Sequence, residues 1–163
     1  MGSGFDRLFD ELDAGFEAAI AREEEDAAND LARALRQDGN LRTAIERGSW
    51  RLKLDDGLIA VVTEVGTDYV VASDTRFGWL VPLSRAFLYS DPDSSFPRSF
   101  NRSLIESLRA HARAGARVEI LSDLGPVTGR LIGAAVDHVR LVTSKRDVLI
   151  AARTIRGVRF EVG

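Results

Sequence analysis

The sequence of 163 residues contains no cysteine, and it has only two histidines, four prolines and one methionine. Without cysteine the chain forms no disulfide and offers no thiolate as a nucleophile or metal ligand. No apolar run approaches the roughly 18 residues of a membrane-spanning helix, and no short apolar stretch follows a basic start as in a signal peptide. We therefore expect a cytoplasmic protein without a membrane partner.

Motifs that carry catalysis are also missing. The sequence has no glycine-rich phosphate loop and no nucleophile elbow. His111 and His138 fall on a predicted helix and a predicted strand, where both are expected at the surface. Asp68 and Asp137 each precede a predicted strand, a position where aspartate bonds local backbone amides. We predict that the protein is not an enzyme and has no catalytic residue, metal site, cofactor or small-molecule substrate.

The net charge of −3 hides an uneven distribution along the chain. Residues 1–48 carry 12 acidic and 6 basic side chains, a net charge of −6, whereas residues 96–163 carry 6 acidic and 12 basic ones, a net charge of +6. The basic region could contact nucleic-acid phosphates, an interaction that salt weakens. It could also face the chain's own acidic arm, which is the simpler interpretation of equal and opposite charges.

Residues 1–48 are expected to form an N-terminal helical arm. Apolar side chains recur every three or four positions from Phe5 to Ile20, as in a helix with one apolar stripe. Gly39-Asn40 is a signal for the end of this helix. The stripe could dock into a groove of another protein, or the helix could lie across the rest of its own chain.

Two later segments, 49–90 and 116–163, show the alternation of half-buried strands. Trp50, Leu52 and Leu54 alternate with charged residues, for example, and glycine-containing turns separate short apolar runs. Short strands at this spacing predict a small β-barrel in each segment.

Residues 91–115, between these segments, are expected to form a linker and a basic helix. Ser103 and Glu106 have the spacing of a capping box, although Ser99 or Asn101 could cap the helix equally well.

The two strand-rich segments are also similar to each other. With an offset of 69 positions, Asp68-Tyr69-Val70 falls on Asp137-His138-Val139, and Leu80-Val81 falls on Leu149-Ile150. A one-residue shift in the first hairpin places Gly57 on Gly125, and the identities are few. The same order of strands and glycine turns runs through both segments. An internal duplication is the economical explanation.

The second segment carries a strand, a glycine, a bent strand and then Asp-x-Val, through Gly125, Gly129, Asp137 and Val139. This pattern resembles the Sm-like and SH3-type small barrels. The chain as a whole resembles an uncharacterised actinobacterial family with tandem barrels of this type. The residues that carry this second resemblance are Phe5-Asp6-Arg7-Leu8-Phe9, Val81-Pro82-Leu83, Arg98-Ser99-Phe100-Asn101-Arg102 and the strand at Asp137.

The resemblance implies RNA binding as one function. Sm-type RNA sites use an Asp- and Asn-containing loop and an Arg-Gly pair, and this chain offers only Arg156-Gly157. The first loop would be Gly133-Ala134-Ala135-Val136-Asp137, which has no asparagine and no aromatic side chain for base stacking.

We therefore predict a mainly β protein with helices, of the α+β class. Two Sm/SH3-like small β-barrels follow a long amphipathic helix and are joined by a second helix. The expected function is a non-catalytic interaction or scaffold module that binds itself or a protein partner, and the alternative is nucleic-acid binding by residues 96–163. The residues expected at a protein interface are Phe5, Phe9, Leu12, Phe16 and Trp79. The residues expected to bind nucleic acid in the alternative are Arg98, Arg102, Arg109, Arg113, Lys145, Arg146 and Arg156.

Overall fold

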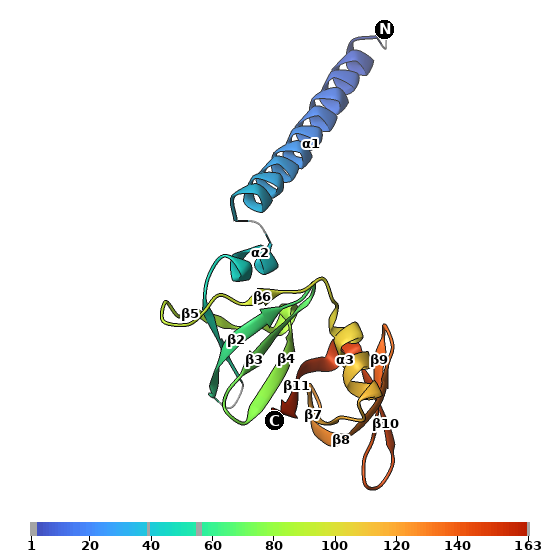
Figure 1. The fold of residues 1–163 in the computed structure, drawn as a ribbon. Coiled ribbons are helices and arrows are strands. Elements are labelled where there is room, and N and C mark those ends of the chain that lie inside the picture. The colour runs from blue at the N-terminus through green and yellow to red at the C-terminus, as the bar shows by residue number, and fades with distance from the viewer. Residues whose placement is uncertain (1–2, 39, 55–56, 163) are drawn as a thin grey trace. The chain divides into compact units, whose positions relative to one another are not determined.

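The computed structural model describes residues 3–38, 40–54 and 57–162. Within the first helix it describes the side chains of residues 11–27 and 29. The chain divides into two compact units, residues 1–40 and residues 41–163, which we treat separately (Figure 1). No described helix is both long and apolar enough to cross a membrane.

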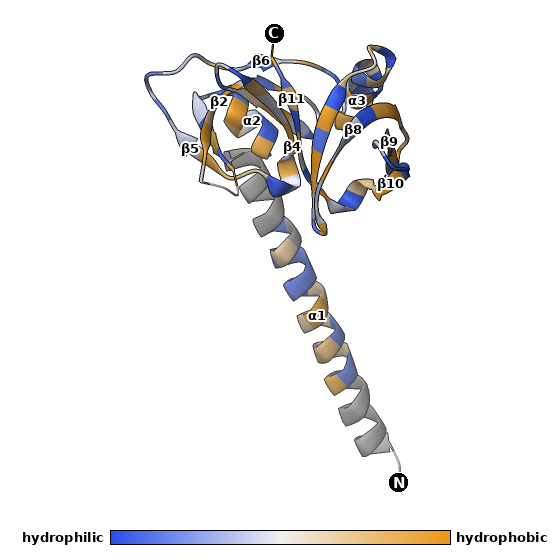
Figure 2. Cartoon of the chain, turned by 90° about the horizontal axis from the view of Figure 1, so that it is seen from below, coloured by the Kyte–Doolittle hydropathy of each residue, from blue (hydrophilic) through white to orange (hydrophobic). Residues whose placement is uncertain are grey.

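The first unit is one long helix, α1, from Ser3 to Asp38. Its sequence is rich in alanine, leucine, glutamate and arginine, which have high helix propensity. The described side chains are exposed, including those of Leu12 and Phe16 in the apolar stripe. Figure 2 shows hydrophobic and hydrophilic segments alternating along the middle of α1. A single helix has nothing within its own unit against which to bury the stripe.

The second unit begins with a short helix, α2 (Leu41–Glu46), and continues mainly as strands. The elements of its first half are β1 (Trp50–Lys53), β2 (Ile59–Val65), β3 (Tyr69–Ser73), β4 (Phe77–Pro82), the 3-10 turn η1 (Leu83–Arg85) and β5 (Leu88–Ser90). A connection with β6 (Arg98–Ser99) and α3 (Leu104–Arg113) follows. The elements of the second half are β7 (Arg117–Ser122), β8 (Gly125–Ala134), β9 (His138–Val142), β10 (Asp147–Ala151), the 3-10 turn η2 (Ala152–Thr154) and β11 (Ile155–Glu161).

The strands form one sheet in the order β10-β9-β8-β7-β11-β4-β3-β2-β1-β5, and β6 pairs in parallel with β2 beside it (Figure 1). All ten strands of the main path pair in antiparallel fashion. The protein is therefore mainly β with helices, as the sequence predicts. The described sheet is not closed into a barrel, because β4 of the first half pairs with β11 of the second half.

The pairing of the two halves follows the same register. Tyr69 pairs with Pro82 in the first half, and His138 pairs with Ala151 in the second, 69 positions later in both strands. A bulge interrupts β2 between Val62 and Glu64, and a bulge interrupts β8 between Leu131 and Gly133 at the same offset. Such bulges bend a strand and increase its twist. The correspondence suggested by a few sequence identities thus extends through the strand pairing.

Each half has its own apolar core. The core of the first half includes Leu52, Val62 and Val81, together with Ile45 of α2. The core of the second half includes Ile120 and Val139, and it also takes up apolar side chains of α3. The α3 residues that complete the second core are Leu104 and Leu108, on its apolar face.

Arg98, Arg102, Arg109 and Arg113 recur at roughly helical spacing in the sequence, but helix α3 begins only at Leu104. Its N-cap is Ser103, whose side chain accepts a hydrogen bond from the backbone N–H of Glu106, which confirms one of the three predicted caps. Arg98 therefore lies in β6 and Arg102 in the loop before the helix, rather than on one helical face with Arg109. The reason is that the 98–99 segment pairs with β2, which holds it extended.

Asp68 does more than shape its own turn. Its Oδ1 accepts a hydrogen bond of 2.7 Å from the backbone N–H of Leu104, so it caps the start of α3 from the β2–β3 turn. Asp137, its counterpart in the second half, instead contacts the neighbouring His138 at 2.7 Å. The expectation that both aspartates serve only their local turns is therefore wrong for Asp68.

Candidate functional site

Strands β10 and β5 are the two outer strands of the described sheet, and each lacks a neighbour that its counterpart in the other half has. Strand β4 lies between β3 and β11, whereas β10, its counterpart in the second half, pairs with β9 alone among the described strands. Similarly, β11 lies between β7 and β4, whereas β5 pairs with β1 and with no other strand that the structure describes. An unpaired strand edge exposes backbone donors and acceptors that can pair with another chain.

Burial at matched positions shows the effect of the missing neighbour. Leu80 of β4 is 1% exposed, and Leu149 of β10, at the matched position, is 67% exposed. Leu80 packs in the core of the second half, so it inserts across the junction between β4 and β11 rather than into its own half. Leu149 occupies the same place on a strand that no described segment covers.

The opposite edge, at β5, also presents apolar side chains. Phe87 and Tyr89 are exposed, and their rings contact each other with centroids 5.2 Å apart. The Lys53 ammonium lies 5.8 Å from the centre of the Phe87 ring. Between these rings Leu88 packs against the core of the first half, as does the nearby Ala86. The edge therefore offers an apolar row beside an existing core.

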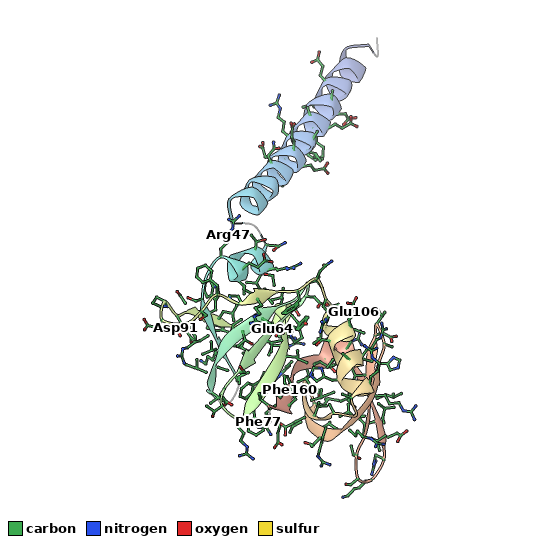
Figure 3. All side chains as sticks on the ribbon, in the orientation of Figure 1. Arg47, Glu64, Phe77, Asp91, Glu106 and Phe160 are labelled. Carbon is green, nitrogen blue, oxygen red and sulfur yellow. The ribbon has the colours of Figure 1, made fainter. Side chains whose placement is uncertain are left out.

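The charges beside the two edges have opposite signs. Lys145 and Arg146, in the turn before β10, are exposed and have no acidic partner within the described part of the chain. Asp91 and Asp93 follow β5 in the chain. Asp91 is bound by Arg51 at 2.6 Å, a hydrogen bond that lowers the pKa of the aspartate below its usual range, and Figure 3 labels it beside the β5 segment.

These charges suit antiparallel pairing. At the internal junction Phe77, which begins β4, lies opposite Glu161, which ends β11. The same arrangement at the outer edges would bring the basic turn before β10 of one copy close to the acidic segment after β5 of another. Opposite charges across such an edge favour this orientation over its reverse.

The residues predicted for a protein interface do not gather at one site. Leu12 and Phe16 are exposed on α1, and the side chains of Phe5 and Phe9 lie outside those that the structure describes. Trp79 could either cap a barrel or stay exposed as an anchor for a partner; it is 3% exposed, which excludes the exposed anchor. Its strand is covered on one side by β11, a neighbour far away in the sequence, and its ring packs in the first core.

The seven basic residues predicted to bind nucleic acid are spread over several elements. Six of them are exposed, and Arg156 of β11 is partly buried. On α3, the side chain of Arg109 donates a 2.8 Å hydrogen bond to the carbonyl oxygen of Ala134, which ties it to β8. Arg113 and the Lys145-Arg146 turn remain exposed cations on the second half. Of the four arginines between residues 98 and 113, Arg109 and Arg113 lie in α3, one turn apart, and the other two precede the helix.

The sequence itself contains a signal for both outer strands. Val148-Leu149-Ile150 and Phe87-Leu88-Tyr89 each break the apolar–polar alternation of a strand with one covered face. A consecutive apolar run indicates a strand that needs cover on both faces. In β4 both faces of the run are buried, whereas in β10 and β5 one face of the run is exposed.

No protein-family model matches the chain, and no curated protein matches it either. Within the described residues, no three histidine, aspartate or glutamate side chains are grouped as metal ligands would be.

Proposed function

We propose that this protein is a non-catalytic scaffold module that binds further copies of itself, with β10 of one copy pairing with β5 of the next. The observation that carries the proposal is the contrast between Leu80, 1% exposed, and Leu149, 67% exposed, at matched positions. In this assembly Leu149 enters the first core of the neighbouring copy, beside Leu88. Each junction between copies then repeats the junction between β4 and β11 within a copy.

The proposed contact is heterologous, because two different edges of the same chain meet. Each copy has one β10 edge and one β5 edge, so pairing continues from copy to copy until a ring closes or a filament forms. We also propose that each half is a small barrel of the Sm or SH3 type. The common strand order, the 3-10 turn before the fifth strand and the shared bulge support this proposal.

The strength of such a contact can be judged from the side chains involved. Burial of Leu149, Phe87 and Tyr89 contributes about 1.5–3 kcal/mol for each large side chain that becomes fully buried. Association costs about 4–15 kcal/mol in lost freedom of motion. The gain and the cost are of similar size, so we expect self-association to depend on protein concentration.

Sedimentation velocity across a wide range of concentration tests this function. The unmodified chain is expected to shift to larger species as concentration rises, and Leu149→Asp is expected to remain a monomer, because it places a charge where the neighbour's core should be. Leu124→Asp is the control, since Leu124 is 98% exposed in the β7–β8 turn and belongs to neither outer strand. A chain that stays monomeric at all concentrations, or a Leu149→Asp variant that assembles normally, would contradict the proposal.

Nucleic-acid binding through residues 96–163 remains the alternative proposal. The exposed Arg113, Lys145 and Arg146 favour it, because none of them has an acidic partner in the described segments. Titration of labelled single-stranded RNA at low and raised salt tests it. Binding that weakens steeply with salt supports this alternative, and no binding at low salt rejects it.

A further inference from the structure

Four exposed arginines of α3, β7 and β8 form no ion pair with any residue that the structure describes. By contrast, Arg140 and Arg159 of the same half each have an acidic partner. The four residues therefore carry positive charges without a counterion in the described part of the chain. They are Arg109, Arg113, Arg117 and Arg130.

Two of these arginines oppose each other in the sheet. Arg117 and Arg130 are direct partners in the pairing of β7 with β8. Direct partners of antiparallel strands project from the same face of the sheet, with Cβ atoms about 4.5–5.5 Å apart, and like charges there destabilise the sheet. Proteins depart from such rules of local stability mainly where function requires it. The pair therefore points to an anionic ligand on this face.

A groove of about 240 Å³ between α3 and β8 connects the other two arginines to this face (Figure 1). Its lining contains Arg109 and Arg113, one helical turn apart, and no acidic residue. Its lining also includes Ile132, two positions beyond Arg130 on β8. Both of these β8 side chains are exposed and Leu131 between them is buried, so they lie on the same face. We call the four arginines and Ile132 the arginine surface.

The groove is open, and one of its guanidinium groups is held in place. The Nε of Arg109 donates a 2.8 Å hydrogen bond to the carbonyl oxygen of Ala134. This bond orients the side chain and leaves its two terminal nitrogens pointing away from the bonded atom. A Cβ at Gly133, in the wall of the groove, would meet no atom within 4 Å. A ligand can therefore approach β8 closely beside Arg109.

The side chains of the arginine surface favour the backbone of a double-stranded nucleic acid as the ligand. Arginine binds phosphate through two-point contacts of its planar guanidinium. A protein interface has an apolar centre, but Ile132 is the one large apolar side chain among these five residues. Single strands are held by stacking of their bases on aromatic rings, and the five residues include no aromatic ring.

We propose that the arginine surface binds the phosphates of a double-stranded nucleic acid. This inference rests on the alternative function proposed above, and it names the contact surface and the ligand class. Each arginine contacts the phosphate backbone, and the bound phosphates relieve the repulsion between Arg117 and Arg130. Contacts of this type position a duplex without reading its sequence. Duplexes of unrelated sequence should therefore bind with equal affinity.

Fluorescence anisotropy with a labelled DNA duplex, measured over a series of salt concentrations, tests the proposal. Four phosphate contacts predict that log K falls against log salt with a slope of about −3.6 or steeper. The double variant Arg117→Gln, Arg130→Gln should reduce this slope by about two and weaken binding about tenfold or more near 0.1 M salt. Arg76→Gln is the matched control, since it removes an exposed arginine from the β3–β4 turn of the first half.

The double variant is expected to remain folded, because it removes a like-charge pair. Its unfolding midpoint, followed by circular dichroism, should not fall below that of the unmodified chain. The corresponding variant Arg117→Lys, Arg130→Lys keeps both charges and should keep the salt slope. A Lys variant that loses the slope as the Gln variant does would contradict phosphate contacts at these positions.

A second double variant, Lys145→Gln, Arg146→Gln, separates this inference from the alternative function. If that variant loses duplex binding while Arg117→Gln, Arg130→Gln keeps the full slope, nucleic-acid binding stands and the arginine surface is overturned as its site. No binding of duplex or single strand at low salt rejects both proposals. A single strand that binds as tightly as the duplex would overturn the inferred ligand class. Poly-glutamate that competes as well as the duplex would do the same, because it would favour an acidic protein partner.

Discussion

Leu80 and Leu149 occupy the same place in two matched strands, but only Leu80 is buried. Leu80 is 1% exposed because β11 covers its strand and the second core receives its side chain, whereas Leu149 is 67% exposed on the outer strand β10. The difference arises from the neighbour and not from the residue, since both are leucines. In the proposed assembly, β5 of a further copy pairs with β10 and buries Leu149.

Truncation of the two leucines should therefore have very different effects on the stability of a single copy. Leu80→Ala is expected to lower the free energy of unfolding by about 2–5 kcal/mol, because it leaves a cavity in the second core. Leu149→Ala is expected to change it by less than about 0.5 kcal/mol at low concentration, as for other exposed positions. Urea unfolding monitored by tryptophan fluorescence measures both. Equal effects of the two substitutions would contradict the difference in burial between Leu80 and Leu149.

Substitution of Gly78 and of Gly133 by alanine provides a second comparison. Gly78→Ala should destabilise the protein by about 1–3 kcal/mol through overpacking, because the new Cβ would be 2.4 Å from the Phe160 ring. A Cβ at Gly133 meets no atom within 4 Å, so Gly133→Ala should be tolerated. Thermal unfolding compares the two variants. A tolerated Gly78→Ala would show that the Phe160 ring does not lie against β4 as described.

Asp68 should contribute to stability through its cap on α3, whereas Asp137 should not. Asp68→Ala removes the acceptor for the Leu104 N–H and is expected to cost about 1 kcal/mol. Asp137→Ala, at the matched position, removes only an exposed contact with His138 and serves as the control. Hydrogen exchange at the first turn of α3 should rise in the Asp68 variant alone. Unchanged exchange there would contradict the capping role.

The Arg51–Asp91 pair predicts a pH dependence of stability. The hydrogen bond from Arg51 lowers the pKa of Asp91 from the usual value of 3.8, so near this pH the folded chain binds fewer protons than the unfolded chain. The pair's contribution is present above the unfolded pKa and is lost as the pH falls through the folded pKa. Arg51→Gln should therefore reduce stability near neutral pH and have a smaller effect in strong acid. A pH titration of the Asp91 carboxyl signal by NMR gives the shift directly, and an unshifted pKa would contradict this account.

Local features of the sequence predicted much of this fold. Alternation around Trp50, Leu52 and Leu54 and the glycine turns indicated short strands, because burial of one face has a two-residue period. Capping signals limited the start of α3 to three candidate residues, and Ser103 is the one that caps the helix. These features depend on residues near one another in the chain.

The junction between the halves could not be predicted in the same way. It pairs Leu80 with Val158, and no local pattern identifies a strand's distant neighbour. For that reason Trp79 was expected among the residues of a protein interface, although β11 pairs with its strand and its side chain is buried. For the same reason the sequence did not identify β10 and β5 as outer strands. Leu149 lies in an apolar run that is typical of a strand covered on both faces, but its side chain is exposed.

Cross-linking between copies tests the central proposal most directly. Because the chain has no native cysteine, one variant can carry Leu149→Cys on β10 and a second Phe87→Cys beside β5. Each variant is treated with a short bismaleimide alone and after mixing, and Leu124→Cys replaces either partner as a control. The account predicts cross-linked dimers in the mixture and only background levels in either variant alone or with the control. Equal cross-linking in the single variants, or none in the mixture, would contradict it.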